Sequence, residues 1–283
     1  MPRATGWKLR DRDLDLGQPI AAGIVNVTSD SMFAGARSGT PERAVADGTA
    51  LAAAGFEMLD VGAVAARSGP PVAAEDESAA LVPAIRGLLD CGLPISADTF
   101  SPRVARAALE AGATAINDIG GGSEEMFELL AEYGAGYVLM QIDGPPRVER
   151  PISAHGDPVE HLRRWFGSRI DAALARGVRE EQIALDPGLD FDLTADEGLA
   201  ILHRLEELHE LGRPLYVSLS RKDLIGAAQA GSWERRAPAE EREWGTAAAA
   251  ALAVRAGAQI LRLHDRSALQ AVRVAGRIAA AAV

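Results

Sequence analysis

The side chains of this protein that could do chemistry follow short apolar runs, and such runs recur along almost the whole chain. Eight runs end on polar or charged residues: GIVN, EMLD, PISAD, AIND, YVLMQ, IALD, YVSLSRK and ILRLH. The residues at these ends are Asn26, Asp60, Asp98, Asn117, Gln141, Asp186, Lys222, and Arg262 or His264. Carboxylates and amides can pair with the N–H and amino groups of a planar heterocycle, whereas cations can hold a phosphate or polarise a carbonyl. Together they predict a site for a ligand that is anionic at one end.

The apolar runs alternate with segments of helical pattern. We expect helices over residues 41–54, 75–90, 102–111, 123–134, 158–177, 194–211, 242–256 and 267–280. Strands that alternate with helices form a parallel sheet. An open doubly wound sheet gathers its ligand groups at one switch point, but here a polar end follows every strand. A closed (β/α)8 TIM barrel, with the polar ends at its mouth, therefore explains the pattern better.

The length indicates one domain, because an α/β barrel usually takes about 250 residues and this chain has 283. We expect the barrel over residues 20–283, preceded by an N-terminal extension over residues 1–19. The stretch WKLRDRDLDL in that extension has short alternating segments. It predicts a hairpin or plug beneath the amino-terminal face of the barrel.

Composition limits the class of partner. Lys and Arg total 29 against 40 Asp and Glu, a formal net charge of -11, which would repel nucleic acid and an anionic membrane. The N-terminus, MPRATGWKLRDRD, has no apolar signal core, and no run approaches the roughly 18 residues of a membrane span. The single Cys91 cannot form an internal disulfide. We expect a cytoplasmic protein that binds neither nucleic acid nor a membrane.

Signals for other catalytic chemistries are weak. Of the five histidines, only His264 is at a strand end; His161, His203 and His209 lie on predicted helices, and His155 lies in a loop. No pair of them has the spacing of zinc ligands, so we expect no zinc site. No GxSxG elbow is present for a nucleophilic serine. The glycine run IGGGSEEM could form an anion-binding nest, although a tight capped turn is the simpler interpretation.

Several connecting segments are long. TSDSMFAGARSGT (28–40) and VAARSGPPVAA (64–74) follow the first two strands and are rich in glycine. Such loops at a barrel mouth often act as lids, but they can also be surface slack, and the sequence leaves both interpretations open. Two further segments, 141–158 and 227–243, are predicted to be irregular.

Seven short strings carry a resemblance to a known family. GIVNVTSDS, LDVGAVAARSGP, ISADT, INDIGG, LDPGLDF, SLSRKDLIG and LRLHD stand in the order, spacing and strand-end placement of the dihydropteroate synthase family. The chain resembles this pterin-binding family over about residues 20–275. The resemblance implies a TIM barrel and a transferase of folate biosynthesis. The amine of p-aminobenzoate would attack the methyl carbon of 6-hydroxymethyl-7,8-dihydropterin diphosphate, and pyrophosphate would leave. It also implies Mg²⁺, small-molecule partners and a homodimer.

The resemblance also assigns roles to single residues. It implies pterin contacts from Asp98, Asn117, Met140, Asp186 and Lys222. It implies diphosphate contacts from Asn26, Arg67, Arg262 and His264, with Asn26 also the residue for the metal. The catalytic residues it implies are Asp98, Lys222, Arg262 and His264. The second-substrate residues it implies are Arg67, Ser68, Phe191 and Asp223.

The chain departs from the family pattern away from the pterin residues. In the second loop VAARSG replaces the usual ESTRPG, so Val64 and Ala66 replace a carboxylate and a hydroxyl, and Ser68 replaces a proline. In the first loop Ala34 stands where an Asp is expected. Asp223 stands where a Ser commonly helps hold the p-aminobenzoate carboxylate, and a like charge there would oppose that carboxylate.

Three functions therefore stay open from the sequence. The first is an active synthase with altered loops. The second is a diverged pterin-binding homologue without synthase activity, which would act on another acceptor or serve as a binding protein. The third is a methyltetrahydrofolate-binding methyltransferase; SRKDLIG and RLHD argue against it, because a methyl transfer has no diphosphate to grip.

Overall fold

The computed structural model describes residues 3–27, 38–65, 67, 69–148 and 154–281. Its centre is a sheet of eight parallel strands in the order β8-β7-β6-β5-β4-β3-β10-β9. The strands are β3 (Ile20–Asn26), β4 (Met58–Gly62), β5 (Ile95–Asp98), β6 (Ala115–Asp118), β7 (Gly136–Met140), β8 (Ile183–Asp186), β9 (Tyr216–Ser218) and β10 (Ile260–Leu263). A bridge between Leu185 and Leu215 joins the two edges, and the Leu185 N–H donates to the Pro214 carbonyl at 2.8 Å. The sheet is a nearly closed barrel, so the predicted TIM-barrel fold is confirmed.

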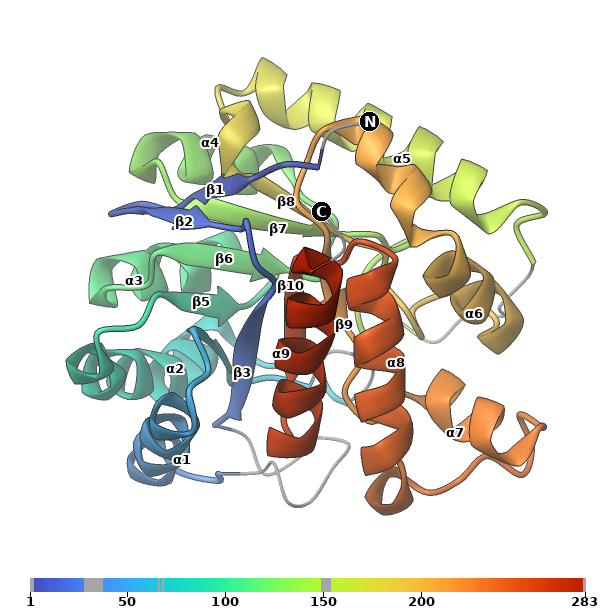
Figure 1. Ribbon diagram of the computed structural model, residues 1–283. Helices are drawn as coiled ribbons and strands as arrows, with labels where there is room; N and C mark the ends of the chain where they lie inside the picture. The colour runs from blue at the N-terminus through green and yellow to red at the C-terminus, as the bar shows by residue number, and fades with distance from the viewer. Residues whose placement is uncertain (1–2, 28–37, 66, 68, 149–153, 282–283) are drawn as a thin grey trace.

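Helices surround the strands (Figure 1). They are α1 (Pro41–Ala54), α2 (Ala74–Leu88), α3 (Pro102–Ala111), α4 (Glu124–Tyr133), α5 (Pro158–Ala175), α6 (Ala195–His203), α7 (Asp223–Ala230), α8 (Glu243–Arg255) and α9 (Arg266–Ala280). Their starts follow local capping rules: the Thr40 hydroxyl accepts the Arg43 N–H before α1, and the Asp157 carboxylate accepts the Val159 N–H before α5. In the described part of the chain, no helix combines the length and the apolar character that crossing a membrane requires.

Two helical predictions were wrong in part. The expected helix over 194–211 is interrupted: α6 ends at His203, and a 3-10 helix, η4 (Leu205–Leu211), follows. Helix α7 was not expected, and its last residues fall in the segment 227–243 that was predicted to be irregular. The Asp190 carboxylate accepts the N–H groups of Asp223 and Leu224 at 2.5 and 3.1 Å and so caps α7 from the preceding βα loop. The residues around position 223 do not indicate this cap, because the capping residue lies in another loop.

Two layers of side chains fill the barrel, because every second residue of a strand points inward. An apolar layer lies toward the amino-terminal ends of the strands and comprises Ala22, Met58, Ala115, Val138, Ala184, Tyr216 and Ile260. Two residues further along the same strands, a mostly polar layer comprises Ile24, Asp60, Asn117, Met140, Asp186, Ser218 and Arg262, with Ser96 and Asp98 on β5. Outward residues such as Val61 and Leu139 join the main core beneath the helices.

The N-terminal extension forms the expected hairpin and closes the apolar layer. Strands β1 (Gly6–Lys8) and β2 (Asp13–Asp15) pair antiparallel. Trp7 is fully buried and Leu9 almost so, both in contact with the apolar layer. The Trp7 indole N–H donates to the Gln182 carbonyl at 2.7 Å, just before β8. The hairpin therefore closes the amino-terminal end of the barrel, and the polar layer lies toward the carboxyl-terminal end.

Candidate active site

Arg262 is held between two carboxylates in the polar layer. Its Nε donates to Asp60 Oδ2 at 2.5 Å and its Nη2 donates to Asp98 Oδ2 at 2.7 Å. Asp60 is fully buried in the middle of β4, not at its end, and also accepts from the Ser96 hydroxyl and from the Asn117 amide. Asp98 is the last residue of β5, with a side chain that is 12% exposed. Burial raises the pKa of Asp98 to about 7, although the Arg262 charge opposes the shift. Asp60 thus orients the arginine, whereas Asp98 borders the mouth.

Asp186 and Lys222 form a second charged group in the barrel mouth. Asp186 ends β8, and its Oδ1 accepts the Gly188 N–H at 2.9 Å. The Lys222 ammonium donates to the Leu189 carbonyl and lies 4.8 Å from the centroid of the Phe191 ring. Burial raises the pKa of Asp186 to about 6 and lowers the pKa of Lys222, and in each case the opposite charge of the other residue works against burial. A buried carboxylate and a buried ammonium therefore lie together at these strand ends.

The turn after β8 requires glycine at position 188. Gly188 has φ of +66°, in the left-handed region, and a Cβ there would lie 2.1 Å from the Gln141 carbonyl oxygen. The DPG string after β8 therefore brings the backbone of this turn against the end of β7. The Gln141 backbone N–H also donates to the Asp186 carbonyl at 2.9 Å, so the ends of β7 and β8 are held together below the mouth.

Two buried amide oxygens in the described part of the protein have no hydrogen-bond donor, Asn117 Oδ1 and Gln141 Oε1. Both side chains are at most 3% exposed. A buried polar group without a partner costs about 1–3 kcal/mol. A ligand in the mouth that brings an N–H donor to the Asn117 oxygen would remove that cost there.

A small apolar cluster lies among these polar groups, separate from the main core. It contains Met140, Ile119 and Ile142, with Phe100 and Phe191 packed against it. Phe191 is also the ring beneath the Lys222 ammonium. Apolar side chains next to buried hydrogen-bonding groups suit a flat, partly polar ring.

Asp223, the first residue of α7, is surrounded by arginines. Its carboxylate lies 2.9 Å from Arg67, 2.8 Å from Arg242 and 3.3 Å from Arg236. Burial would raise the pKa of Asp223, but hydrogen bonds from Arg67 and Arg242 outweigh burial, and the pKa is lowered. Three positive charges around one negative charge leave a positive surplus. The repulsion of a carboxylate that the sequence alone predicts for Asp223 is therefore offset.

His264 is a neutral hydrogen-bonding group. The Ser220 hydroxyl lies 2.8 Å from its Nδ1 and accepts its backbone N–H at 3.1 Å. Burial, followed by the charges of Arg262 and Arg221, lowers the pKa of His264 to about 3. Arg221 itself is bound to Asp265 by two hydrogen bonds, at 3.0 and 2.7 Å. Near pH 7 the imidazole therefore adds no charge beside Arg262.

This constellation of carboxylates, amides and cations agrees with what comparison with known proteins finds. The family described as pterin binding enzyme matches residues 22–264. The chain belongs to the pterin-binding enzyme family.

Relatives within this pterin-binding family match nearly the full length of the chain. The dihydropteroate synthase of Synechocystis sp. is 36% identical over 251 residues, which are 87% of this chain and 85% of that protein. The structure of Xanthomonas albilineans dihydropteroate synthase in complex with 7,8-dihydropteroate has a TM-score of 0.83 at 34% identity and covers 99% of this chain and 100% of that one. The same enzyme with 4-aminobenzoic acid has a TM-score of 0.86 at 34% identity, with 99% of each chain covered. The relatives compared here are synthases, and the methyltransferase alternative gains no support from them.

The site residues predicted for this pterin-binding enzyme lie in two places. Those at or just after the carboxyl ends of barrel strands are Asn26, Asp98, Asn117, Met140, Asp186, Lys222, Arg262 and His264. Arg67 and Asp223 belong instead to the arginine cluster around α7, and Phe191 borders Lys222. Ser68, Ala66 and Ala34 lie outside the described residues.

Three further residues complete the site and were not predicted from the sequence. Ser96 stands two positions before Asp98, so strand periodicity could have placed it on the same inner face. Asp190 and Arg242, which hold the start of α7 and the Asp223 carboxylate, gave no such signal. Both act across loops, where spacing along the chain does not predict contact.

Proposed function

We propose that this protein catalyses the dihydropteroate synthase reaction of folate biosynthesis, joining 6-hydroxymethyl-7,8-dihydropterin diphosphate to p-aminobenzoate with release of pyrophosphate. One observation carries this proposal: the buried amide oxygen without a donor, Asn117 Oδ1, lies in a mouth that also holds the Asp186 carboxylate and the Lys222 ammonium. A pterin ring offers N–H and amino donors for the oxygens and acceptors for the ammonium. The synthase relatives with dihydropteroate and 4-aminobenzoic acid support the same substrates.

The pterin would bind against the polar layer of the barrel. Asp186 and Asn117 would accept hydrogen bonds from the amino group and ring N–H groups, and Lys222 would donate to the ring. Met140 and its apolar neighbours would contact the faces of the ring. Because Asp186 and Lys222 are already buried, the ligand would bind to them without much further loss of hydration.

The transfer step needs charge stabilisation and no covalent nucleophile. The carbon–oxygen bond breaks and its electron pair leaves with pyrophosphate; the amine nitrogen then supplies the pair for the new carbon–nitrogen bond and loses a proton. Positive charge develops on the pterin, where Asp98 and Asp186 would stabilise it. Negative charge develops on the leaving group, where Arg262 would act as the cation and His264 as a hydrogen-bonding group.

Asn26 would hold Mg²⁺ together with oxygens of the diphosphate. An amide oxygen is a hard ligand of the kind that Mg²⁺ accepts, and Mg²⁺ usually shares its shell with substrate phosphates. Asn26 ends β3 beside Gly62, which has no side chain to fill the space between Asn26 and Asp98. When bound, the ion would neutralise part of the charge on the departing pyrophosphate.

The p-aminobenzoate carboxylate would bind near Arg67. The positive surplus of the arginine cluster supports this placement despite Asp223. Phe191 would contact the aminobenzoate ring, and Ser68 is kept as a further contact by the resemblance alone. The altered loops make this half of the site the part that differs from the family pattern.

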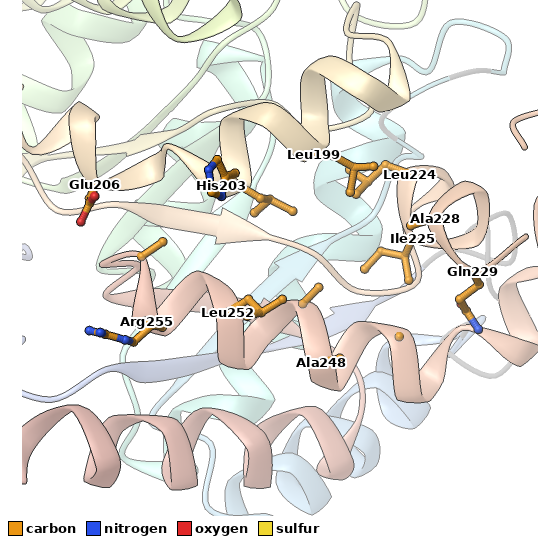
Figure 2. A pocket seen from close by; sticks show the side chains of 14 residues that line it. Leu199, His203, Glu206, Leu224, Ile225, Ala228, Gln229, Ala248, Leu252 and Arg255 are labelled. Atoms are coloured by element: carbon orange, nitrogen blue, oxygen red, sulfur yellow. The ribbon is translucent and has the colours of Figure 1, made fainter. Parts of the chain in front are cut away.

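We also propose that the protein forms a homodimer and is located in the cytoplasm. A cavity of about 670 Å³ lies between α6, α7 and α8, and Figure 2 shows leucine and alanine side chains lining it. Leu199 and Leu252 on its edges are 38% and 68% exposed, and Trp244 nearby on α8 is 77% exposed. An apolar surface of this kind supports association with a second copy of the chain.

The direct test is product formation. The protein is incubated with the pterin diphosphate, labelled p-aminobenzoate and Mg²⁺, and labelled dihydropteroate and pyrophosphate are measured; binding of the pterin diphosphate alone is measured by calorimetry. Turnover would establish the reaction. Tight pterin binding without turnover would instead establish the diverged homologue and direct the search to another acceptor.

A further inference from the structure

Three metal-ligand side chains meet beside the barrel, outside the mouth described above. Asp143 follows β7, His155 precedes α5, and His161 lies in the first turn of α5. Asp143 Oδ2 lies 2.8 Å from His155 Nε2 and 3.3 Å from His161 Nε2. One potential ligand atom from each residue lies within 4.8 Å of the other two, and the imidazole centroids are 4.1 Å apart.

A second carboxylate orients His155 from behind. Glu197 Oε1 lies 3.0 Å from His155 Nδ1 and accepts the His155 backbone N–H at 2.6 Å. Glu197 is itself fixed by a capping box with Thr194 at the start of α6. With a proton on Nδ1 directed at Glu197, a neutral ring has its lone pair on Nε2, directed at the Asp143 oxygen. A histidine that donates one nitrogen to a carboxylate and presents the other to a metal is the usual arrangement of metal-binding histidines.

Both histidines of this cluster direct Nε2 at the same carboxylate oxygen. Asp143 Oδ2 lies 2.8 Å from His155 Nε2. His161 faces the same oxygen, and the side-chain amide nitrogen of Gln141, a donor, lies 3.5 Å from the same His161 Nε2. A bound cation would satisfy both imidazole nitrogens and the carboxylate at once.

We propose that Asp143, His155 and His161 bind one Zn²⁺ ion, with a water molecule as the fourth ligand. Two imidazoles and a carboxylate suit zinc, whereas Mg²⁺ prefers an all-oxygen shell, so this site is distinct from the one at Asn26. In a tetrahedral site with bonds of about 2.1 Å, ligand atoms lie about 3.4 Å apart. The distance from Asp143 to His161 already has that value within about 0.1 Å, and the distance from Asp143 to His155 would open slightly.

The ion would join three segments around the carboxyl end of β7. Asp143 comes from the segment after β7, the two histidines from α5 and the residues before it, and Glu197 from α6. The Asp143 backbone N–H also donates to Asp192 in the β8–α6 loop at 3.1 Å. The site is therefore structural: it fixes the wall of the mouth behind Gln141. The spacing between histidines alone predicted no zinc site, because Asp143 was not counted among the possible ligands.

Metal binding can be tested without any substrate. Untagged, metal-free protein is titrated with Zn²⁺ by calorimetry and with Co²⁺ by visible absorption, and thermal unfolding is followed with and without Zn²⁺. We expect one equivalent of Zn²⁺, Co²⁺ absorption bands of a four-coordinate site, and a rise in Tm with Zn²⁺. Because no pterin or Mg²⁺ is present, the result is independent of the proposed synthase activity.

Matched variants separate this site from adventitious binding. Glu197→Gln keeps the capping box, because glutamine also serves in it, and should weaken Zn²⁺ binding about 10–100-fold. His161→Gln should abolish the Co²⁺ bands, and Asp143→Asn is the alternative if that variant does not fold by circular dichroism. His203→Gln, at an exposed histidine on α6, should bind Zn²⁺ like the wild type. No Zn²⁺ uptake by the wild type, or equal affinity in Glu197→Gln and His161→Gln, would overturn the proposal.

Discussion

The apolar layer and the polar layer inside the barrel lie two residues apart on the same strands, yet their energetics are opposite. Met58, Tyr216 and their neighbours are buried without charge and are covered by Trp7 of the hairpin. Asp60 and Arg262 are buried as ions, and a buried ion pair contributes little net stability because desolvation offsets the attraction. The amino-terminal end of the barrel therefore stabilises the fold, and the carboxyl-terminal end holds charged groups that serve ligand binding.

The pKa values of the buried carboxyl groups differ in the same sense. Burial raises the pKa of Asp98 to about 7 and the pKa of Asp186 to about 6, so the folded protein binds more protons at these groups than the unfolded chain does. Stability from these two groups therefore falls as pH rises from about 4 to 7. The polar layer is charged at neutral pH at a cost to stability, as expected of a binding site.

The largest effect is expected on replacing the central cation. Arg262→Met leaves the carboxylates of Asp60 and Asp98 buried without the positive charge that pairs with them, and should lower the free energy of unfolding by about 3–5 kcal/mol at neutral pH. The loss should be smaller in mild acid, because the carboxylates then take up protons. Urea unfolding at two pH values measures both.

The same variant tests the role of Arg262 in binding. Its affinity for the pterin diphosphate, measured by calorimetry, should fall much more than its affinity for the free pterin alcohol. Adding Asp60→Asn should recover part of the stability without recovering diphosphate affinity. Equal losses for the two ligands would place Arg262 outside the diphosphate site.

Truncation in the plug should affect stability alone. Trp7→Ala removes a fully buried ring from the apolar layer and should lower the free energy of unfolding by about 3–5 kcal/mol. Turnover per folded molecule at low temperature should not change. Trp7→Phe, which keeps most of the apolar contact and loses the hydrogen bond to Gln182, is the milder control. A lower kcat/KM in fully folded Trp7→Ala protein would show that the two layers are coupled, contrary to this comparison.

Pterin affinity should depend on the charge of Asp186. Its pKa of about 6 means that the carboxylate protonates as pH falls through that value, so pterin affinity should decrease below it. Asp186→Asn should lose about 1.5–3 kcal/mol of binding free energy above pH 7 and should show a flatter pH profile. Ionisation of the pterin itself is common to both proteins and cancels in their comparison. Parallel pH profiles would exclude Asp186 as the titrating group.

The sequence predicted most of the polar layer, because a polar residue that ends an apolar run indicates the carboxyl end of a strand. Asp98 and Asp186 do end their strands, whereas Asn117 lies one residue before the end of β6 and Asp60 lies in the middle of β4. The starts of α1 and α5 were predicted because their caps are local.

Features that depend on contacts across loops were not predicted. Helix α7 begins where Asp190 of another loop accepts its N–H groups, and no residue near position 223 signals this. The cluster of Asp143, His155 and His161 was not predicted for the same reason, because a segment predicted to be irregular separates Asp143 from the two histidines along the chain. Long-range geometry, which spacing does not encode, decided both.

The smallest effect is expected at the rim of the mouth. It distinguishes an Asp223 that orients Arg67 from an Asp223 that repels the p-aminobenzoate carboxylate. If Asp223 orients Arg67 for the p-aminobenzoate carboxylate, Asp223→Asn should raise the KM for p-aminobenzoate by up to about five-fold, the roughly 1 kcal/mol expected of a partly exposed pair. The difference should shrink in high salt. Asp171→Asn, which removes the same charge from an exposed site on α5, should leave KM unchanged. A fall in KM on Asp223→Asn would instead mean that like-charge repulsion, as read from the sequence alone, outweighs the arginines. The charge of Asp223 at the rim would then oppose p-aminobenzoate, whereas the charges of the polar layer bind the pterin.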